Sequence, residues 1–173
     1  MRKKQILYEV IRAEEGPFTD ERDKKKFLDI VQEVKEKMGI SILAFCVTDE
    51  ESHFLVEGQS ERAFVLAAAQ MVGDFERYYK KRYQKSCGNM VQEIRFRKMM
   101  TEEEIVDNCM ELHLFPVKLK LVERPEDYWW SSYTDYRRNY KRGIVSTDLV
   151  LKYLDADRKR AVRKFVCLHH GSQ

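Results

Sequence analysis

The sequence predicts an α+β fold: a four-stranded antiparallel sheet with helices on one face, followed by a C-terminal helical extension. The first observation is the order of the expected elements, which runs strand, helix, strand, strand, helix, strand, helix. The second is that the first two helical segments carry wide apolar faces, as helices packed on a sheet do. The third is a length of 173 residues with 43% hydrophobic content, which is enough for one core. This order of elements is that of the ferredoxin-like split βαβ sandwich.

The first half of the chain contains one expected strand and two expected helices. Apolar residues alternate along residues 5–12 well enough to indicate a strand. The next segment predicts an amphipathic helix with an N-cap at Thr19 or Asp20 and a glycine stop at Gly39. Ser60 is the expected N-cap of the second helix.

A β-hairpin is expected between these two helices. Residues 40–47 and 53–56 are short β-rich runs on either side of a polar tip, residues 48–52, which predicts a hairpin with a longer loop. A lone histidine, His53, begins the second strand. A strand holds a ligand more precisely than a loop does, so this rim of the sheet is a candidate site.

The second half of the chain predicts one more strand and a series of helices. Residues 90–100 are β-like, and Thr101 with Glu104 forms a capping box that opens a helix. Pro116 is expected to end that helix. Two further helices are expected, from Ser146 or Thr147 to Leu154 and from Asp157 to Leu168.

The expected division of the chain is a ferredoxin-like domain over residues 1–122 and a packed extension over residues 123–173. In the extension, Tyr128, Trp129 and Trp130 are each expected to bury a large ring and to form a structural clamp.

The histidines outside the hairpin are interpreted as structural or solvated. His113 is expected to be a packed or hydrogen-bonded residue, and His169 and His170 are expected to lie in a solvated terminus.

Charge and cysteine usage narrow the class of protein. A net charge of +3 with 35% charged residues allows nucleic acid as a partner without requiring it. Cys46, Cys87, Cys109 and Cys167 have neither metal-site nor disulfide spacing, so reduced thiols and a cytoplasmic location are expected. No apolar run has the length and context of a signal peptide or a membrane span, so no membrane association is expected.

A basic and aromatic run, RYYKKRYQK, ends the second helix. It combines cations that suit phosphates with flat rings that suit base stacking. The other interpretation is a solvated helix end whose tyrosines pack sideways on the core. With two arginines of the following strand, the candidate nucleic-acid-binding residues are Arg77, Tyr78, Lys80, Lys81, Arg82, Tyr83, Arg95 and Arg97.

Three segments, ILAFCVTDEESHFLVEG, ELHLFPVKLKLV and PEDYWWSSYTDY, occur in this order. Together they resemble the single-tyrosine HUH transposases of the insertion-sequence-200 type, especially their repeat-associated bacterial relatives, and the resemblance spans residues 5–140. It implies a ferredoxin-like fold that binds single-stranded or hairpin DNA and cleaves it. In that family two histidines separated by one residue bind a divalent metal, a helix supplies a tyrosine nucleophile, and an amide one turn later completes the metal site. The metal polarises the scissile phosphate while the tyrosine attacks to form a 5′-phosphotyrosine link.

The family's functional positions are largely replaced in this sequence. The paired histidines fall on Glu51 and His53, the tyrosine falls on Glu111, and the amide falls on Phe115. A carboxylate cannot serve as the alcohol-type nucleophile, and a phenyl ring cannot coordinate a metal. The glycine expected after this motif is replaced by Lys120. The resemblance therefore implies a degenerate catalytic site in which Glu51 and His53 remain the candidate metal ligands.

Three functions stay open at this point. The leading one is a transposase-like DNA-binding protein that has lost tyrosine-mediated cleavage and needs no cofactor. The second is an active enzyme in which Glu51 and His53 hold Mg²⁺ or Mn²⁺ and another tyrosine attacks. The third is a protein-interaction or regulatory module whose basic clusters are solvated surface. DNA is the expected partner, and a homodimer is an assembly that the sequence allows.

Overall fold

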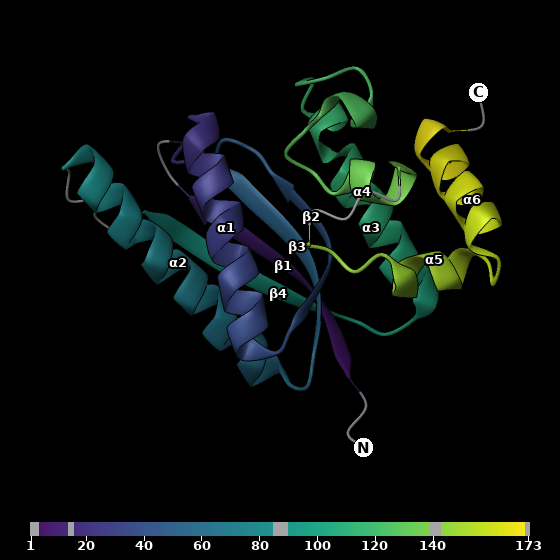
Figure 1. Cartoon of the computed structure of the whole chain (residues 1–173), viewed down its shortest axis with the longest axis horizontal. Coiled ribbons are helices and arrows are strands. Elements are labelled where there is room, and N and C mark those ends of the chain that lie inside the picture. Colours follow the sequence, from purple (N-terminus) through teal and green to yellow (C-terminus); the bar gives the residue numbers. More distant parts are fainter. Residues whose placement is uncertain (1–3, 14–15, 85–89, 139–142, 172–173) are drawn as a thin grey trace.

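The computed structural model describes residues 4–13, 16–84, 90–138 and 143–171 (Figure 1). Its strands form one antiparallel sheet in the order β2-β3-β1-β4, which confirms the ferredoxin-like sandwich. In chain order the elements are β1 (Gln5–Ala13), α1 (Glu21–Met38), β2 (Ser41–Val47), β3 (Glu51–Gly58), α2 (Glu61–Tyr83), β4 (Val91–Met99), α3 (Glu102–Lys118), the 3-10 turn η1 (Pro125–Asp127), α4 (Tyr133–Arg138), α5 (Asp148–Leu154) and α6 (Arg158–His170).

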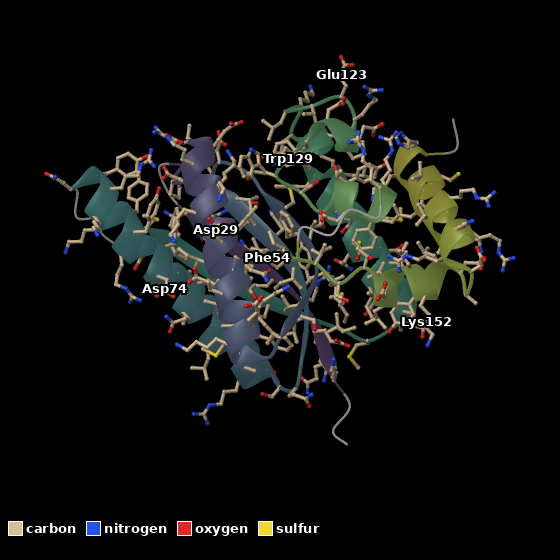
Figure 2. All side chains as sticks on the ribbon, in the orientation of Figure 1. Asp29, Phe54, Asp74, Glu123, Trp129 and Lys152 are labelled. Atoms are coloured by element: carbon tan, nitrogen blue, oxygen red, sulfur yellow. The ribbon has the colours of Figure 1, made fainter. Side chains whose placement is uncertain are left out.

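Helices lie on both faces of the sheet. Figure 1 shows the two crossover helices, α1 and α2, together on one side, and α3 to α6 on the other. Side chains alternate along a strand, so β1 contributes Leu7 and Ile11 to the core under α1 and α2, and Ile6 to the core under α3. Phe54 lies near the middle of the molecule, in the core that the sheet shares with α1 and α2 (Figure 2). The expected layer of α1 and α2 is present, and a second layer closes the opposite face.

The predicted caps at Asp20, Ser60 and Thr101 and the predicted stop at Gly39 are confirmed. The side chain of Asp20 accepts a hydrogen bond from the backbone of Arg22, and Ser60 and Thr101 cap α2 and α3 in the same way. Gly39 ends α1 in the left-handed region, with φ of 64°.

Pro116 does not end its helix, contrary to the prediction. It lies inside α3, which continues to Lys118. A proline removes one N–H donor from a helix and crowds the carbonyl four residues earlier, and α3 continues for only two residues beyond Pro116. The chain turns afterwards at Lys120, which has a φ of 58°, and the backbone N–H of Leu121 donates to the carbonyl of Pro116 at 3.0 Å. Lys120 therefore occupies the left-handed position where the sequence resemblance expected glycine.

Two other expectations are corrected. β3 begins at Glu51, so the hairpin tip is shorter than residues 48–52, and Thr48 N donates to Glu51 O across it at 2.8 Å. Trp129 does not bury its ring: the residue is 57% exposed, whereas Tyr128 is buried and donates from its hydroxyl to Val47 O at 2.8 Å.

The segment after α3 runs along the outer edge of β2. Val47 N donates to Trp130 O, Ser132 N donates to Phe45 O, and Ser146 N donates to Ile42 O, at 2.8 to 2.9 Å. These bonds cover one edge of the sheet, which otherwise exposes unpaired backbone groups. No helix in the described ranges has the length and apolar character needed to cross a membrane.

Candidate nucleic-acid interface

Three arginines lie in neighbouring rows on the sheet face that α3 partly covers. Strand register sets these rows, because residues paired across an antiparallel sheet point to the same face. Arg12, Arg95 and Arg97 are exposed. The paired rows are Glu51–Arg12–Glu93, His53–Val10–Arg95 and Leu55–Tyr8–Arg97.

His53 is the centre of a hydrogen-bonded chain on this face. The hydroxyl of Tyr8 lies 2.7 Å from His53 Nδ1, and His53 Nε2 lies 3.0 Å from Glu51 Oε2. Glu51 Oε1 accepts from the guanidinium of Arg12 at 2.6 Å. A tyrosine hydroxyl donates here, so the neutral imidazole accepts at Nδ1 and carries its proton at Nε2 toward Glu51.

Burial and charge set the protonation of this chain. Burial lowers the pKa of His53 below its ordinary value of 6.5, although Glu51 opposes the shift. Burial opposes ionisation of Glu51, but Arg12 and His53 together leave the pKa of that carboxyl lowered. Burial raises the pKa of Tyr8 to about 12, and the charge of Glu111 adds to the shift. At neutral pH these three hydrogen-bonded side chains are therefore a neutral His53, an ionised Glu51 and a neutral Tyr8.

The residues that the family resemblance singled out gather at this place. Phe115 packs on His53, with ring centroids 4.3 Å apart. Glu111, one turn earlier on α3, is close enough to Tyr8 to act on its pKa. The hairpin and the helix therefore bring Glu51, His53, Glu111 and Phe115 to one site.

This site does not fit a divalent ion as its side chains are arranged. A metal ligand needs a free lone pair, and the neutral imidazole of His53 has none, because Nδ1 accepts from Tyr8 and Nε2 carries its proton toward Glu51. Each oxygen of Glu51 keeps a second lone pair but already accepts a hydrogen bond, from Arg12 or from His53. An ion would also have to sit beside the Arg12 guanidinium and the apolar ring of Phe115. Across the part of the chain that the structure describes, no group of three or more His, Cys, Asp or Glu side chains gathers to hold a metal.

Arg97 is held in place by two neighbours. Its guanidinium carbon lies 5.7 Å from the ring centroid of Tyr8, and its Nη2 donates to Asn108 Oδ1. Asn108 is buried and donates in turn to Glu104 O at 2.7 Å. Neither Tyr8 nor Asn108 was singled out from the sequence, because both contacts depend on which strand and helix lie side by side.

The basic end of α2 lies on the other face of the sheet, and much of it is bound to α1. The hydroxyls of Tyr78 and Tyr83 donate to buried Asp23 at 2.7 and 2.6 Å. Arg82 pairs with Asp20 at 3.1 Å and with Asp23 at 3.5 Å. These contacts favour the interpretation of a helix end whose tyrosines pack on the protein. The remaining cations in the described part of the run are Arg77, which pairs with Asp74, and Lys80 and Lys81, which are exposed, whereas Lys85 lies outside the described residues.

A buried chain of polar residues joins α6 to α3 and β2, and the sequence did not indicate it. His169 Nδ1 donates to Phe165 O at 2.7 Å, and burial lowers the pKa of His169 to about 4. His169 is therefore neutral and accepts at Nε2 from His113 Nδ1, at 3.2 Å, while the hydroxyl of Ser132 donates to His113 Nε2 at 2.7 Å. The structural role expected for His113 is present, but the expectation that His169 is solvated was wrong.

Comparison with known proteins gives a likeness of fold. No family model matches the chain, and no curated protein matches it. Among solved structures, a REP-associated tyrosine transposase bound to a REP hairpin aligns with a TM-score of 0.60 at 13% identity, covering 85% of this chain and 84% of that chain. A protein from Deinococcus radiodurans R1 assigned as a transposase aligns with a TM-score of 0.45 at 11% identity, covering 60% of this chain and 83% of that chain. The first likeness shows that this chain has the fold of a REP-associated tyrosine transposase.

Proposed function

We propose that this protein is a transposase-like DNA-binding protein that takes single-stranded or hairpin DNA on the sheet face beside α3, and that it has lost tyrosine-mediated cleavage. The observation that carries this proposal is the set of exposed arginines, Arg12, Arg95 and Arg97, in adjacent rows of one sheet face. Guanidinium groups suit phosphate oxygens because their planar fork offers several donors. A solved structure with the same fold was determined with a hairpin bound, which supports DNA as the partner.

The loss of cleavage follows from the side chains at the reactive positions. Glu111 stands where the resemblance requires a tyrosine, and a carboxyl side chain has no alcohol-type hydroxyl for this attack. Phe115 stands where an amide ligand is required, and its ring packs on His53 instead. The proposal therefore includes no cofactor.

A binding titration over a salt series tests the proposal. A labelled DNA hairpin with a single-stranded tail is titrated with the protein between about 50 mM and about 200 mM salt. Neutralising a phosphate on single-stranded DNA contributes a slope of about −0.7 to log K against log salt, so three arginines predict a slope of about −2. If the protein does not bind the hairpin even at the lowest salt concentration, the proposal is refuted.

The two competing functions give different results in the same samples. An active metal-dependent enzyme would leave a covalent protein–DNA adduct when MnCl2 is added, visible as a band that survives denaturation. An interaction module would show neither adduct nor DNA binding. Glu51 and Glu93 beside the arginines are the observation that favours this module, because they offset part of the positive charge. The homodimer stays a prediction, which light scattering of the DNA-free protein tests.

A further inference from the structure

The three arginines of the interface differ in what balances their charge. We infer that Arg97 is a preformed anchor for one nucleic-acid phosphate, and that this anchor works without a divalent cation. The inference rests on the proposed DNA-binding function, and it names the residue and the chemistry that carry recognition.

Arg12 and Arg95 are each paired with a carboxylate. Arg12 meets Glu51 at 2.6 Å, and Arg95 meets Glu93 at 2.7 Å. A phosphate that approaches either guanidinium meets the carboxylate as well, so much of the attraction is cancelled.

Arg97 has a neutral partner instead. It donates to the amide oxygen of Asn108, and among the described residues no carboxylate lies within ion-pair distance of it. An amide fixes the guanidinium by a hydrogen bond but leaves its positive charge uncompensated. Arg97 is therefore the strongest attractor for an anion of the three.

The same contacts make Arg97 rigid before an anion arrives. Tyr8 supports the guanidinium from one side, at 5.7 Å, and buried Asn108 is itself fixed to the backbone of α3. An arginine held this way loses less conformational entropy on binding than a mobile one. Glu111, one turn beyond Asn108 on α3, acts on the same tyrosine and is the opposing charge nearby.

The independence from a metal follows from the hydrogen bonds around His53 and Glu51. The atoms of Glu51 and His53 that would bind a metal are engaged with Arg12 and Tyr8, so the positive charge on this face comes from guanidinium groups. The anchor then needs neither Mg²⁺ nor Mn²⁺ to hold a phosphate.

The test compares Arg97→Ala with its matched control Arg95→Ala, each removing one exposed arginine from the same strand and face. Affinity for the labelled hairpin is expected to fall about 10-fold or more for Arg97→Ala, as for the loss of a hydrogen bond to a charged group. For Arg95→Ala a loss below about fivefold is expected, as for an exposed ion pair. Arg97→Ala lowers the salt slope by about 0.7, whereas Asn108→Ala weakens binding with the slope unchanged, because the charge of Arg97 remains. Circular dichroism confirms that each variant is folded.

Affinity is measured in EDTA and in MnCl2 at matched ionic strength, and equal values are expected. Equal losses for Arg97→Ala and Arg95→Ala, or a requirement for Mn²⁺, would overturn the inference while the DNA-binding proposal stands. If the wild type binds no DNA, the anchor is tested with inorganic pyrophosphate instead. The arginine side-chain NMR signals are followed during that titration. A larger shift at Arg97 than at Arg95 then supports the anchor, and no shift at Arg97 overturns it.

Discussion

Glu9 makes the stability of this protein depend on pH. It lies in the middle of β1, paired with Phe54 and Phe96, and its carboxyl is buried with Oε1 lacking a hydrogen-bond partner among the described residues. Burial raises the pKa of Glu9 from its ordinary value of 4.5 to about 8. The folded protein therefore holds Glu9 protonated at neutral pH, while the unfolded chain ionises it.

The sign and size of the effect follow from linkage. A carboxyl with a raised pKa contributes stability that is fully present below pH 4.5 and is lost as the pH rises through 8. Between about pH 5.5 and about pH 7.5 the loss is about 2.5 kcal/mol, at 1.36 kcal/mol for each unit of pH over most of that window. Such a loss is a large part of the stability of an ordinary domain.

Urea unfolding at these two pH values measures the free energy of unfolding. Glu9→Gln carries a neutral amide of the same shape at both pH values, so it lacks the loss that Glu9 causes. His53 and His169, whose pKa values are lowered, add stability as the pH rises, but they do so equally in both proteins, so the difference of about 2.5 kcal/mol between wild type and variant remains. Glu33→Gln, at an exposed position of α1, is the matched control and is expected to behave as the wild type does. If the wild type and Glu9→Gln lose the same free energy between the two pH values, the reasoning about Glu9 is refuted.

Two further predictions concern the end of α2 and the site that contains Glu51 and Phe115. Asp23→Ala is expected to lower the free energy of unfolding by about 3 kcal/mol, since a buried carboxylate that holds three side chains of α2 is removed. Asp29→Ala, which breaks the exposed pair with Lys25, is expected to cost less than about 1 kcal/mol in the same urea assay. A similar loss of unfolding free energy for both variants would show that the contacts of Asp23 with α2 do not stabilise the fold. The double variant Glu51→His with Phe115→Asn is expected to bind Mn²⁺ in calorimetry, whereas each single variant is expected not to bind it. A double variant that binds no Mn²⁺ would contradict the assignment of these positions.

The sheet and its crossover helices followed from local signals. Caps at Asp20, Ser60 and Thr101 and the stop at Gly39 act within a few residues of their own position, so the sequence alone was enough. The prediction for Pro116 was wrong because proline disfavours a helix at the residue before it without fixing where the helix ends.

The candidate site was predicted in its positions but not in its contacts. Glu51 and His53 were found by a motif, yet their partners Tyr8 and Arg12 are known only once the register of β1 against β3 is fixed. The same holds for Asp23, which lies far in the sequence from Tyr78 and Tyr83. His169 follows Phe165 by four residues, and this spacing places both on the buried face of α6, which is a sequence signal for a buried His169.

The central claim is that DNA binds the sheet face beside α3 and not the basic end of α2. It is tested most directly by measuring hairpin affinity for two double variants that change the net charge equally, Arg95→Glu with Arg97→Glu and Lys80→Glu with Lys81→Glu. The first pair is expected to weaken binding by about 100-fold or more at low salt, and the second by less than about fivefold. Equal losses, or a larger loss for the pair on α2, would contradict the account.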